Sequence, residues 1–265
     1  MVAGRSWIQA CVVSGLLCMG MPAKAEVSAL NLSPGFPTSL DDAYPINSGT
    51  MALQPALRLD KTERGDARFR QTVDMRWGVT HGMELFVGAT GIRGALQPGT
   101  LDDPRAVRAG LMYRMYKQQG AGAWMPILAL RTTVQVPYGG PESHASLRSE
   151  LLASWDLSHE WWGHVNVGTQ LVPGGQVGLQ GPGRNALWYG RIGVVKAIGR
   201  NVGLVGGVSY SQDYTQANGT LITPEVGLTY GFAQNWIATI GAGRDFGGSN
   251  SEATVKGNVG ISFVW

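Results

Sequence analysis

Arginines spaced two residues apart are the side chains in this sequence with the clearest chemistry. In the stretch RFRQTVDMRW, Arg68, Arg70 and Arg76 lie at alternate positions, and the positions between them are mostly apolar. Successive side chains of a strand point to opposite faces, so these guanidinium groups would share one face. Guanidinium groups bind carboxylates and phosphates, whether on a diffusing anion or on a neighbouring strand. The spacing therefore predicts a charged face that serves either anion binding or internal ion pairing.

The same alternation places further charged residues on this face. The ten cations are Arg58, Arg68, Arg70, Arg76, Arg108, Arg114, Arg131, Arg148, Arg191 and Lys256. The six anions are Asp74, Glu84, Glu150, Asp156, Glu225 and Asp245. The excess of four cations is what a pore that favours anions would carry. The alternative is that arginine–carboxylate pairs hold a narrow barrel together, and the sequence leaves both interpretations open.

A weaker chemical signal lies in PESHAS, which contains Ser143, His144 and Ser146. A Ser–His pair generates a nucleophile when the base lies within hydrogen-bond reach and an acid orients it. A loop rich in glycine and proline does not ensure that geometry, so a lipid hydrolase is an alternative and not the main expectation. The other histidines have no metal-ligand spacing, and neither a metal nor a cofactor is expected.

The elements that must position these residues are short strands. About twelve segments alternate apolar and polar residues with the period of two that is typical of strands. They span residues 50–59, 67–77, 82–92, 104–117, 123–136, 146–157, 161–172, 185–197, 202–212, 220–231, 236–246 and 253–265. A tilted strand of about ten residues crosses a bilayer, whereas no apolar run here reaches the roughly 18 residues of a membrane helix.

This pattern predicts an all-β chain that forms a closed antiparallel up-and-down transmembrane β-barrel of about twelve strands over residues 50–265. Closure leaves no unpaired strand edge in hydrocarbon. The connections alternate between short turns, such as 79–81 and 199–201, and longer loops. In such barrels the short turns face the periplasm and the long loops face outward. The alternative is a soluble barrel or sandwich whose apolar face points inward.

The N-terminus has the features of a secretory signal peptide over residues 1–25. Arg5 precedes an apolar stretch, and Ala23 and Ala25 provide a cleavage site before Glu26; a membrane anchor is the alternative. Both cysteines, Cys11 and Cys18, lie in this segment, so the mature chain would hold no disulfide. Residues 26–49 lack strand alternation, and this segment is expected either in the periplasm or inside the lumen.

Aromatic residues gather near the ends of the expected strands that meet at short turns. They are Trp77, Tyr116, Trp124, Trp155, Trp161, Trp162, Phe232 and Trp236. Membrane barrels carry girdles of aromatic rings at the boundary between lipid and water. The position of these residues therefore favours a membrane barrel over the core of a soluble sandwich.

The stretch FRQTVDMRWGVTHGMELFVGATG resembles the meta-pathway phenol-degradation, or transporter-like, family of outer-membrane proteins, with Arg76 to Thr80 as a tight turn before Glu84. The family name implies uptake of aromatic or other small organic compounds. The terminal Phe263 and Trp265 look like the C-terminal aromatic signal that the barrel assembly machinery recognises. This family usually ends in phenylalanine, so Trp265 is a departure that is still aromatic.

These observations together lead us to expect a barrel in the outer membrane of a Gram-negative cell. The main expectation is a channel or transport-associated protein for small molecules, either aromatic or anionic. Its partners would be outer-membrane lipid, the assembly machinery and a small-molecule permeant. The predicted mature chain has 19 basic and 18 acidic residues, so no nucleic-acid partner is expected. The alternatives are the lipid hydrolase and a structural or adhesive barrel with ligand-binding outer loops.

Overall fold

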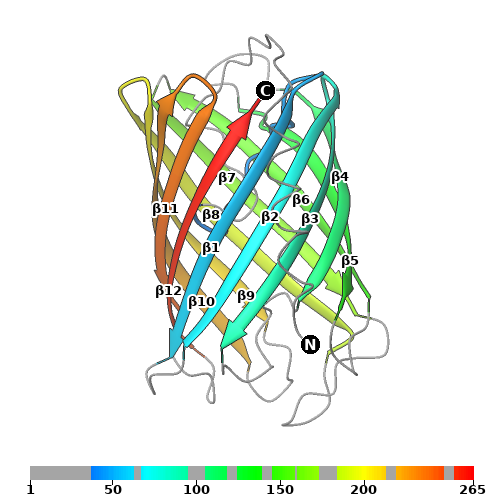
Figure 1. Cartoon of the computed structure of the whole chain (residues 1–265). Coiled ribbons are helices and arrows are strands. Elements are labelled where there is room, and N and C mark those ends of the chain that lie inside the picture. The colour runs from blue at the N-terminus through cyan, green and yellow to red at the C-terminus, as the bar shows by residue number, and fades with distance from the viewer. Residues whose placement is uncertain are drawn as a thin grey trace, which may run out of the picture.

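The chain folds into a single closed antiparallel barrel of twelve strands, shown in Figure 1. The computed structural model describes residues 37–62, 67–94, 105–117, 124–138, 145–158, 160–172, 184–212, 219–247 and 254–265. The strands are β1 Met51–Thr62, β2 Ala67–Thr80, β3 Met83–Gly94, β4 Ala106–Tyr116, β5 Ile127–Pro137, β6 Ser146–Ser158, β7 Trp161–Leu171, β8 Ala186–Ile198, β9 Val202–Gln212, β10 Thr220–Ala233, β11 Trp236–Arg244 and β12 Thr254–Val264. The predicted fold class is therefore confirmed.

Closure occurs where the first strand meets the last. Strand β1 pairs with β2 on one side and with β12 on the other, so no edge of the sheet is left open. At the end of this seam the backbone N–H of Met51 donates to the carbonyl of Trp265 over 2.8 Å, and the reverse bond measures 2.9 Å. The C-terminal residue thus completes the pairing. Among the described residues, no helix is long and apolar enough to cross a membrane.

Several predicted strand ends were wrong by a few residues. Strand β1 continues to Thr62 and not only to residue 59, because Asp60 points inward and binds arginines of the barrel wall. Strand β5 begins at Ile127 and not at 123, directly after Pro126, which lacks the N–H needed for a ladder bond. Strand β2 runs to Thr80, so the following turn lies at 81–82 and not at 79–81.

The two faces of the barrel differ as the alternation predicts. On β2, Phe69, Val73 and Trp77 are exposed on the outside, whereas the arginines between them are buried inside. The other strands also expose large apolar side chains, among them Val107, Leu151, Ile192 and Val259. An outer apolar surface over a polar interior is the arrangement of a barrel that faces lipid.

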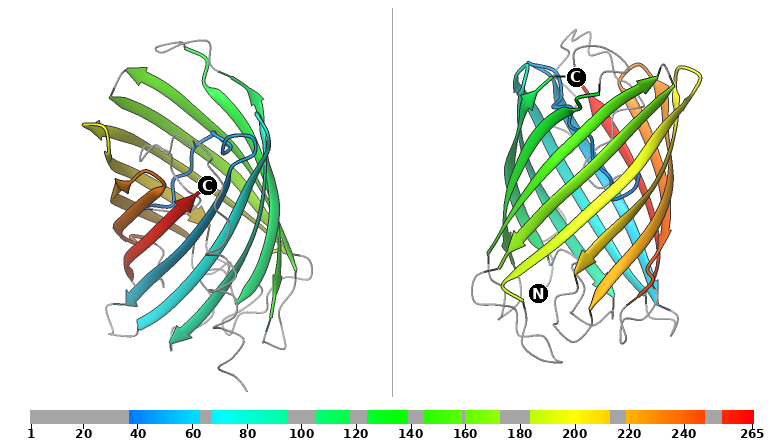
Figure 2. Two further views of the ribbon diagram at one scale, coloured as in Figure 1. Left: turned by 45° about the horizontal axis from the view of Figure 1, so that its top comes forward. Right: turned by 180° about the vertical axis from the view of Figure 1, so that it is seen from behind.

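Residues 37–49, which we call the inner segment, run through the inside of the barrel. Figure 2 shows this blue segment within the ring of strands in both views. It joins β1 at the end where the short turns lie, since Gly49 N–H donates to the carbonyl of Gly78 over 2.7 Å. The predicted signal peptide and residues 26–36 lie outside the described residues.

Aromatic side chains do collect where β10, β11 and β12 end near the short turns. Rings of Phe232 and Trp236 lie 6.2 Å apart, those of Trp236 and Phe263 lie 4.5 Å apart, and those of Phe263 and Trp265 stack at 5.3 Å. The assignment of Trp162 to this outer group was wrong. Its ring points inward and packs against buried Leu40, Val195 and Val205, because an apolar part of the inner segment lies beside it.

Candidate functional site

The backbone of the inner segment forms hydrogen bonds with side chains of the barrel wall. Four of its backbone N–H groups, most of them two residues apart, donate to inward-pointing side chains. The bonds are Ser39 to Glu225 Oε2 at 2.9 Å, Asp41 to Asn166 Oδ1 at 2.9 Å, Ala43 to Ser154 Oγ at 2.9 Å and Ile46 to Glu84 Oε2 at 3.0 Å. Asn166 also donates back to the carbonyl of Asp41 over 2.9 Å. The wall therefore satisfies donors that would be costly to bury unpaired.

Apolar side chains of the inner segment fit apolar patches on the otherwise polar inner wall. Ala43 and Tyr44 pack with four residues of β4, β5 and β6, namely Met112, Ile127, Ala129 and Leu152. Burial, followed by the charges of Asp42 and Asp156, raises the pKa of Tyr44 to about 12, so its phenol stays neutral. Sequence reasoning missed this contact, although the signal was present: Met112 and Leu152 are large apolar residues at inward positions of strands.

Glycines of the wall leave room for the backbone of the inner segment. A Cβ atom at Gly241 would lie 1.8 Å from the carbonyl oxygen of Pro37, and one at Gly227 would lie 2.6 Å from Pro37 Cγ. These two glycines face each other across β10 and β11. A Cβ at Gly78 would lie 2.0 Å from the carbonyl oxygen of Asn47. The inner segment thus occupies a groove that any side chain at these positions would fill.

Most charged residues of the inner face are ion-paired. A buried aspartate that the sequence placed in a loop, Asp60, binds three arginines at once. Its carboxylate lies 2.6 Å from Arg58, 3.3 Å from Arg68 and 3.9 Å from Arg70. Asp41 and Asp42 of the inner segment are also buried inside the barrel. These three carboxylates reduce the excess of four cations to one, so the predicted charge balance was wrong.

Other pairs link neighbouring strands. Arg76 of β2 forms two bonds of 2.7 Å with Glu84 of β3, and Arg108 of β4 binds Asp74 of β2. Lys256 of β12 lies 2.5 Å from Asp245. The interpretation of these residues as internal ion pairs is therefore supported for the wall as a whole.

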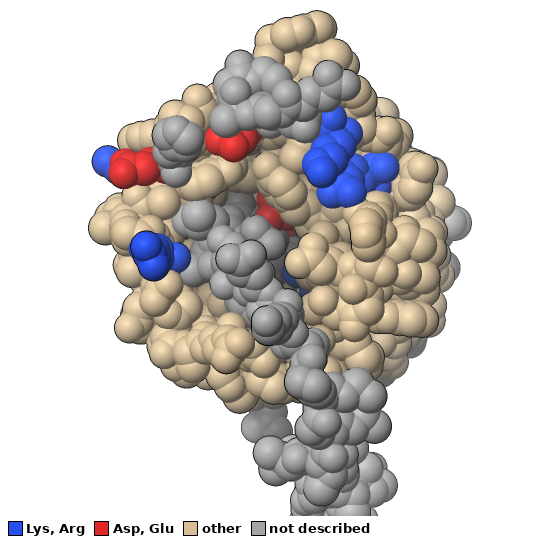
Figure 3. Space-filling view, turned by 90° about the horizontal axis from the view of Figure 1, so that it is seen from above, with Lys and Arg blue, Asp and Glu red and all other residues tan. Residues whose placement is uncertain are grey.

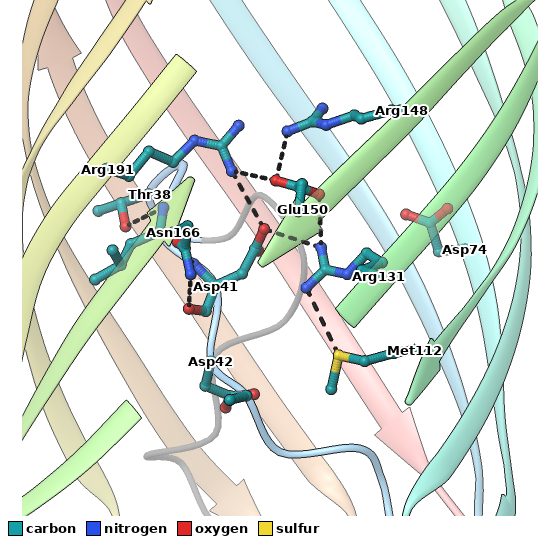
Figure 4. A network of polar contacts seen from close by, with 12 residues as sticks. Thr38, Asp41, Asp42, Asp74, Met112, Arg131, Arg148, Glu150, Asn166 and Arg191 are labelled. Atoms are coloured by element: carbon teal, nitrogen blue, oxygen red, sulfur yellow. Dashed lines mark hydrogen bonds and ion pairs between the residues drawn. The ribbon is translucent and has the colours of Figure 1, made fainter. Parts of the chain in front are cut away.

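One cluster joins the wall to the inner segment, as Figure 4 shows. Asp41 Oδ2 accepts from Arg131 Nη1 at 2.9 Å and from Arg191 Nη1 at 3.3 Å. The same two arginine nitrogens lie 3.7 Å and 3.1 Å from the carboxylate of Glu150, which also accepts from Arg148 at 3.0 Å. Three guanidinium groups of β5, β6 and β8 thus share two carboxylates, of which only Glu150 belongs to the wall.

A cavity of about 220 Å³ lies beside this cluster. Its basic lining residues are Arg58, Arg70, Arg76, Arg108, Arg131, Arg148, Arg191 and Lys256, and its acidic ones are Asp41, Asp74, Glu150 and Glu225. Three of these basic residues, Arg58, Arg76 and Lys256, pair with Asp60, Glu84 and Asp245, which do not line the cavity. Basic side chains therefore outnumber acidic ones among the lining residues, although the net positive charge around the cavity is smaller. Figure 3, drawn from the short-turn end, shows a central hollow in which both acidic and basic atoms are visible.

The structure separates the residues predicted to line the lumen into two groups. Ten of them border the cavity: Arg58, Arg70, Arg76, Arg108, Arg131, Arg148, Glu150, Arg191, Glu225 and Lys256. The remaining three do not border it. Arg68 is buried against Asp60, Arg114 donates to the carbonyl of His81 beside a short turn, and Asp156 lies near the same end of the barrel. Phe263 and Trp265 lie at the seam.

The residues considered for lipid hydrolysis are not brought together in the described part of the chain. Ser146 lies on the inner face of β6, where its hydroxyl accepts from Gln170 Nε2 over 3.2 Å, and it therefore does not face lipid. Ser143 and His144 lie outside the described residues, as do the outer loops considered for adhesion. Within the described ranges, no group of three or more acidic, histidine or cysteine residues could hold a metal ion.

Neutralising Asp60 should destabilise the barrel. In an Asp60→Asn variant the buried guanidinium groups of Arg68 and Arg70 and the half-buried one of Arg58 lose their shared carboxylate, and breaking a buried pair costs about 3–5 kcal/mol. We expect the urea concentration at half-unfolding, followed by the shift between folded and unfolded bands on a gel, to fall clearly. Lys61→Gln, at the exposed neighbouring position, is the matched control. Equal midpoints for the two variants would contradict a structural role of Asp60.

Comparison with known proteins shows similarity of fold to outer-membrane channel barrels. No protein-family model and no curated protein matches the chain, so the resemblance to the phenol-degradation family stays a prediction. Among solved structures, the chain is similar to the NanC porin (TM-score 0.62, 11% identity, 80% of this chain and 98% of that chain). It is also similar to an outer membrane channel from Pseudomonas putida F1 (0.64, 11%, 88% and 100%) and to the KdgM porin in complex with disordered oligogalacturonate (0.52, 12%, 80% and 98%). The chain therefore has the fold of an outer-membrane channel barrel.

Proposed function

We propose that this chain is a channel of the cell outer membrane that passes small anionic molecules. The observation that carries the proposal is the cavity lined by eight basic and four acidic side chains inside a barrel with an apolar exterior. Basic rings in a narrow lumen lower the energy of a passing anion. The channel barrels to which this chain is similar in fold support transport over a purely structural role.

The inner segment limits the open cross-section in this proposal. Its apolar contacts lie in the half of the barrel near the short turns, whereas the cavity extends among residues closer to the long loops, such as Arg148 and Tyr189. Burying Leu40 stabilises this position by roughly 2 kcal/mol, and each hydrogen bond to the wall contributes about 1 kcal/mol. Ordering the segment costs about 1 kcal/mol per residue, which opposes these contributions, and we expect the segment to leave the lumen reversibly.

Ion selectivity in planar bilayers tests this function. With a KCl gradient across the membrane, we expect a reversal potential that indicates preference for chloride over potassium. In an Arg108→Gln variant this preference should fall, because a cation that borders the cavity is removed. Arg114→Gln is the matched control, since Arg114 does not border the cavity. A cation-preferring pore, or an equal loss of preference in both variants, would refute the proposal.

We further propose that Phe263 and Trp265 form the signal by which the assembly machinery recognises the last strand. Their stacked rings at 5.3 Å and the pairing of Trp265 with Met51 support a role at the closing seam. We expect a Trp265→Ser variant to reach the outer membrane in much lower amount, measured by immunoblotting of membrane fractions. Trp188→Ser, which removes an outward tryptophan from β8, should cause a smaller loss. Equal losses would contradict the proposal.

A further inference from the structure

The carboxylate of Asp41 occupies a site that the barrel wall builds without it. Arg148 and Arg191 lie over the ring of Tyr189, at 4.5 Å and 4.9 Å from its centre. The Nε of Arg148 also donates to the hydroxyl of Tyr189 over 2.7 Å. These contacts with Tyr189 help to hold Arg148 and Arg191 without the inner segment, whereas Arg131 contacts the wall carboxylate of Glu150 at 3.7 Å.

The wall alone leaves this site short of negative charge. In the described part of the chain, Arg131, Arg148 and Arg191 converge on the wall carboxylate of Glu150. Their side chains have relative exposures of 6%, 25% and 13%, so water screens the charges of Arg131 and Arg191 poorly. Asp41, which is not part of the wall, supplies the second carboxylate. A guanidinium pair of this kind has the geometry that suits a planar carboxylate.

The site is reached through the cavity. Asp41, Arg131, Arg191 and Glu150 all border the same space of about 220 Å³. A small anion in this space would therefore lie close to both arginines and to Asp41. The backbone of Asp41 is also bonded twice to Asn166, so release of the inner segment requires these two bonds to break after the carboxylate has been displaced.

We propose that Arg131 and Arg191 form a carboxylate-binding site in which Asp41 is an internal occupant, and that a small carboxylate in the lumen displaces Asp41 and releases the inner segment. This inference rests on the proposed function, because it names the anion class that the channel would admit. Displacement of Asp41 removes the charged link between the segment and the wall. The bound carboxylate would then also increase the open cross-section of the lumen through which it passes.

Binding of propionate to the purified barrel in detergent tests the site. We expect Asp41→Asn to bind propionate at least about tenfold more tightly than the unchanged protein, because the ligand no longer competes with an internal carboxylate. Asp42→Asn is the matched control and should leave the affinity unchanged. Arg131→Gln combined with Asp41→Asn should abolish binding. Equal affinities of the unchanged protein and Asp41→Asn, or binding of neutral propionamide as tight as that of propionate, would overturn the proposal.

A second measurement uses the barrel with Asp41 in place. Ala43 is fully buried, so a cysteine at this position should react slowly with a water-soluble maleimide. Propionate should accelerate this labelling and propionamide should not; no acceleration by propionate would overturn displacement. Conductance of the same preparations separates this inference from the proposed function. Anion currents without propionate-dependent labelling would refute only the site, whereas propionate binding in a barrel that never conducts would refute the channel.

Discussion

Removing residues 27–46 is expected to raise the single-channel conductance by at least about threefold, because conductance follows the open cross-section of the narrowest part of a pore. In the described part of this stretch, Leu40, Ala43 and Tyr44 pack against the inner wall in the short-turn half of the lumen. The deletion retains Glu26 after the predicted signal peptide. It also retains Asn47 to Thr50, where Thr50 N–H donates to the carbonyl of Asn47 over 3.0 Å.

The barrel itself should survive this deletion. Each of the twelve strands forms backbone hydrogen bonds with its two neighbouring strands, and the inner segment is not one of these strands. Heat-dependent migration on gels will show whether the variant is folded before its conductance is measured. A folded deletion variant with the conductance of the full chain would mean that the inner segment does not limit the pore.

A point substitution should act in the same direction. In Gly241→Ala the added Cβ would lie 1.8 Å from the carbonyl oxygen of Pro37, so the inner segment must shift at Pro37. Gly257→Ala is the matched control, because Gly257 lies on the adjacent strand and a Cβ added there would enter open space. We expect a higher and more variable current for Gly241→Ala alone, although smaller than that of the deletion.

The barrel could be predicted from the sequence because its information is local. Alternation of side chains along a strand needs no knowledge of distant residues, and Phe69, Val73 and Trp77 opposite Arg68 and Arg70 already define two faces. The alternation of short and long connections then fixes an even strand number and an up-and-down order. Exact strand ends were less predictable, since Asp60 extends β1 through contacts with arginines of the neighbouring strand that appear only once the strands have paired.

The inner segment was the part that the sequence could not place. Residues 26–49 have no strand pattern, so their position depends on contacts with residues far along the chain. Asp41 bonds to Asn166, which lies 125 positions away, and Ser39 bonds to Glu225, which lies 186 positions away. The prediction of the net charge in the lumen failed for the same reason, because Asp41 and Asp42 come from a segment outside the strands. Inward apolar residues such as Leu152 were the one local sign that something apolar lies inside.

A disulfide that ties the inner segment to the barrel wall is expected to have the second large effect on the current. The N–H of Ala43 donates to Ser154 Oγ over 2.9 Å, so these two residues are in contact and are the pair to replace by cysteines that could form a disulfide. The predicted mature chain contains no cysteine of its own, and the new bond would therefore be the only one in the protein. Single-cysteine variants at either position provide the controls for modification without cross-linking.

Control of the pore by the inner segment is tested most directly by measuring the current through one population of these disulfide-linked channels in a planar bilayer, before and after a reductant is added. With the disulfide formed, the inner segment cannot leave the lumen, and we expect a low anion current. Reduction should raise the current to the level of the single-cysteine controls. A current that is the same before and after reduction, with the disulfide shown to have formed, would contradict the claim that the inner segment controls the pore.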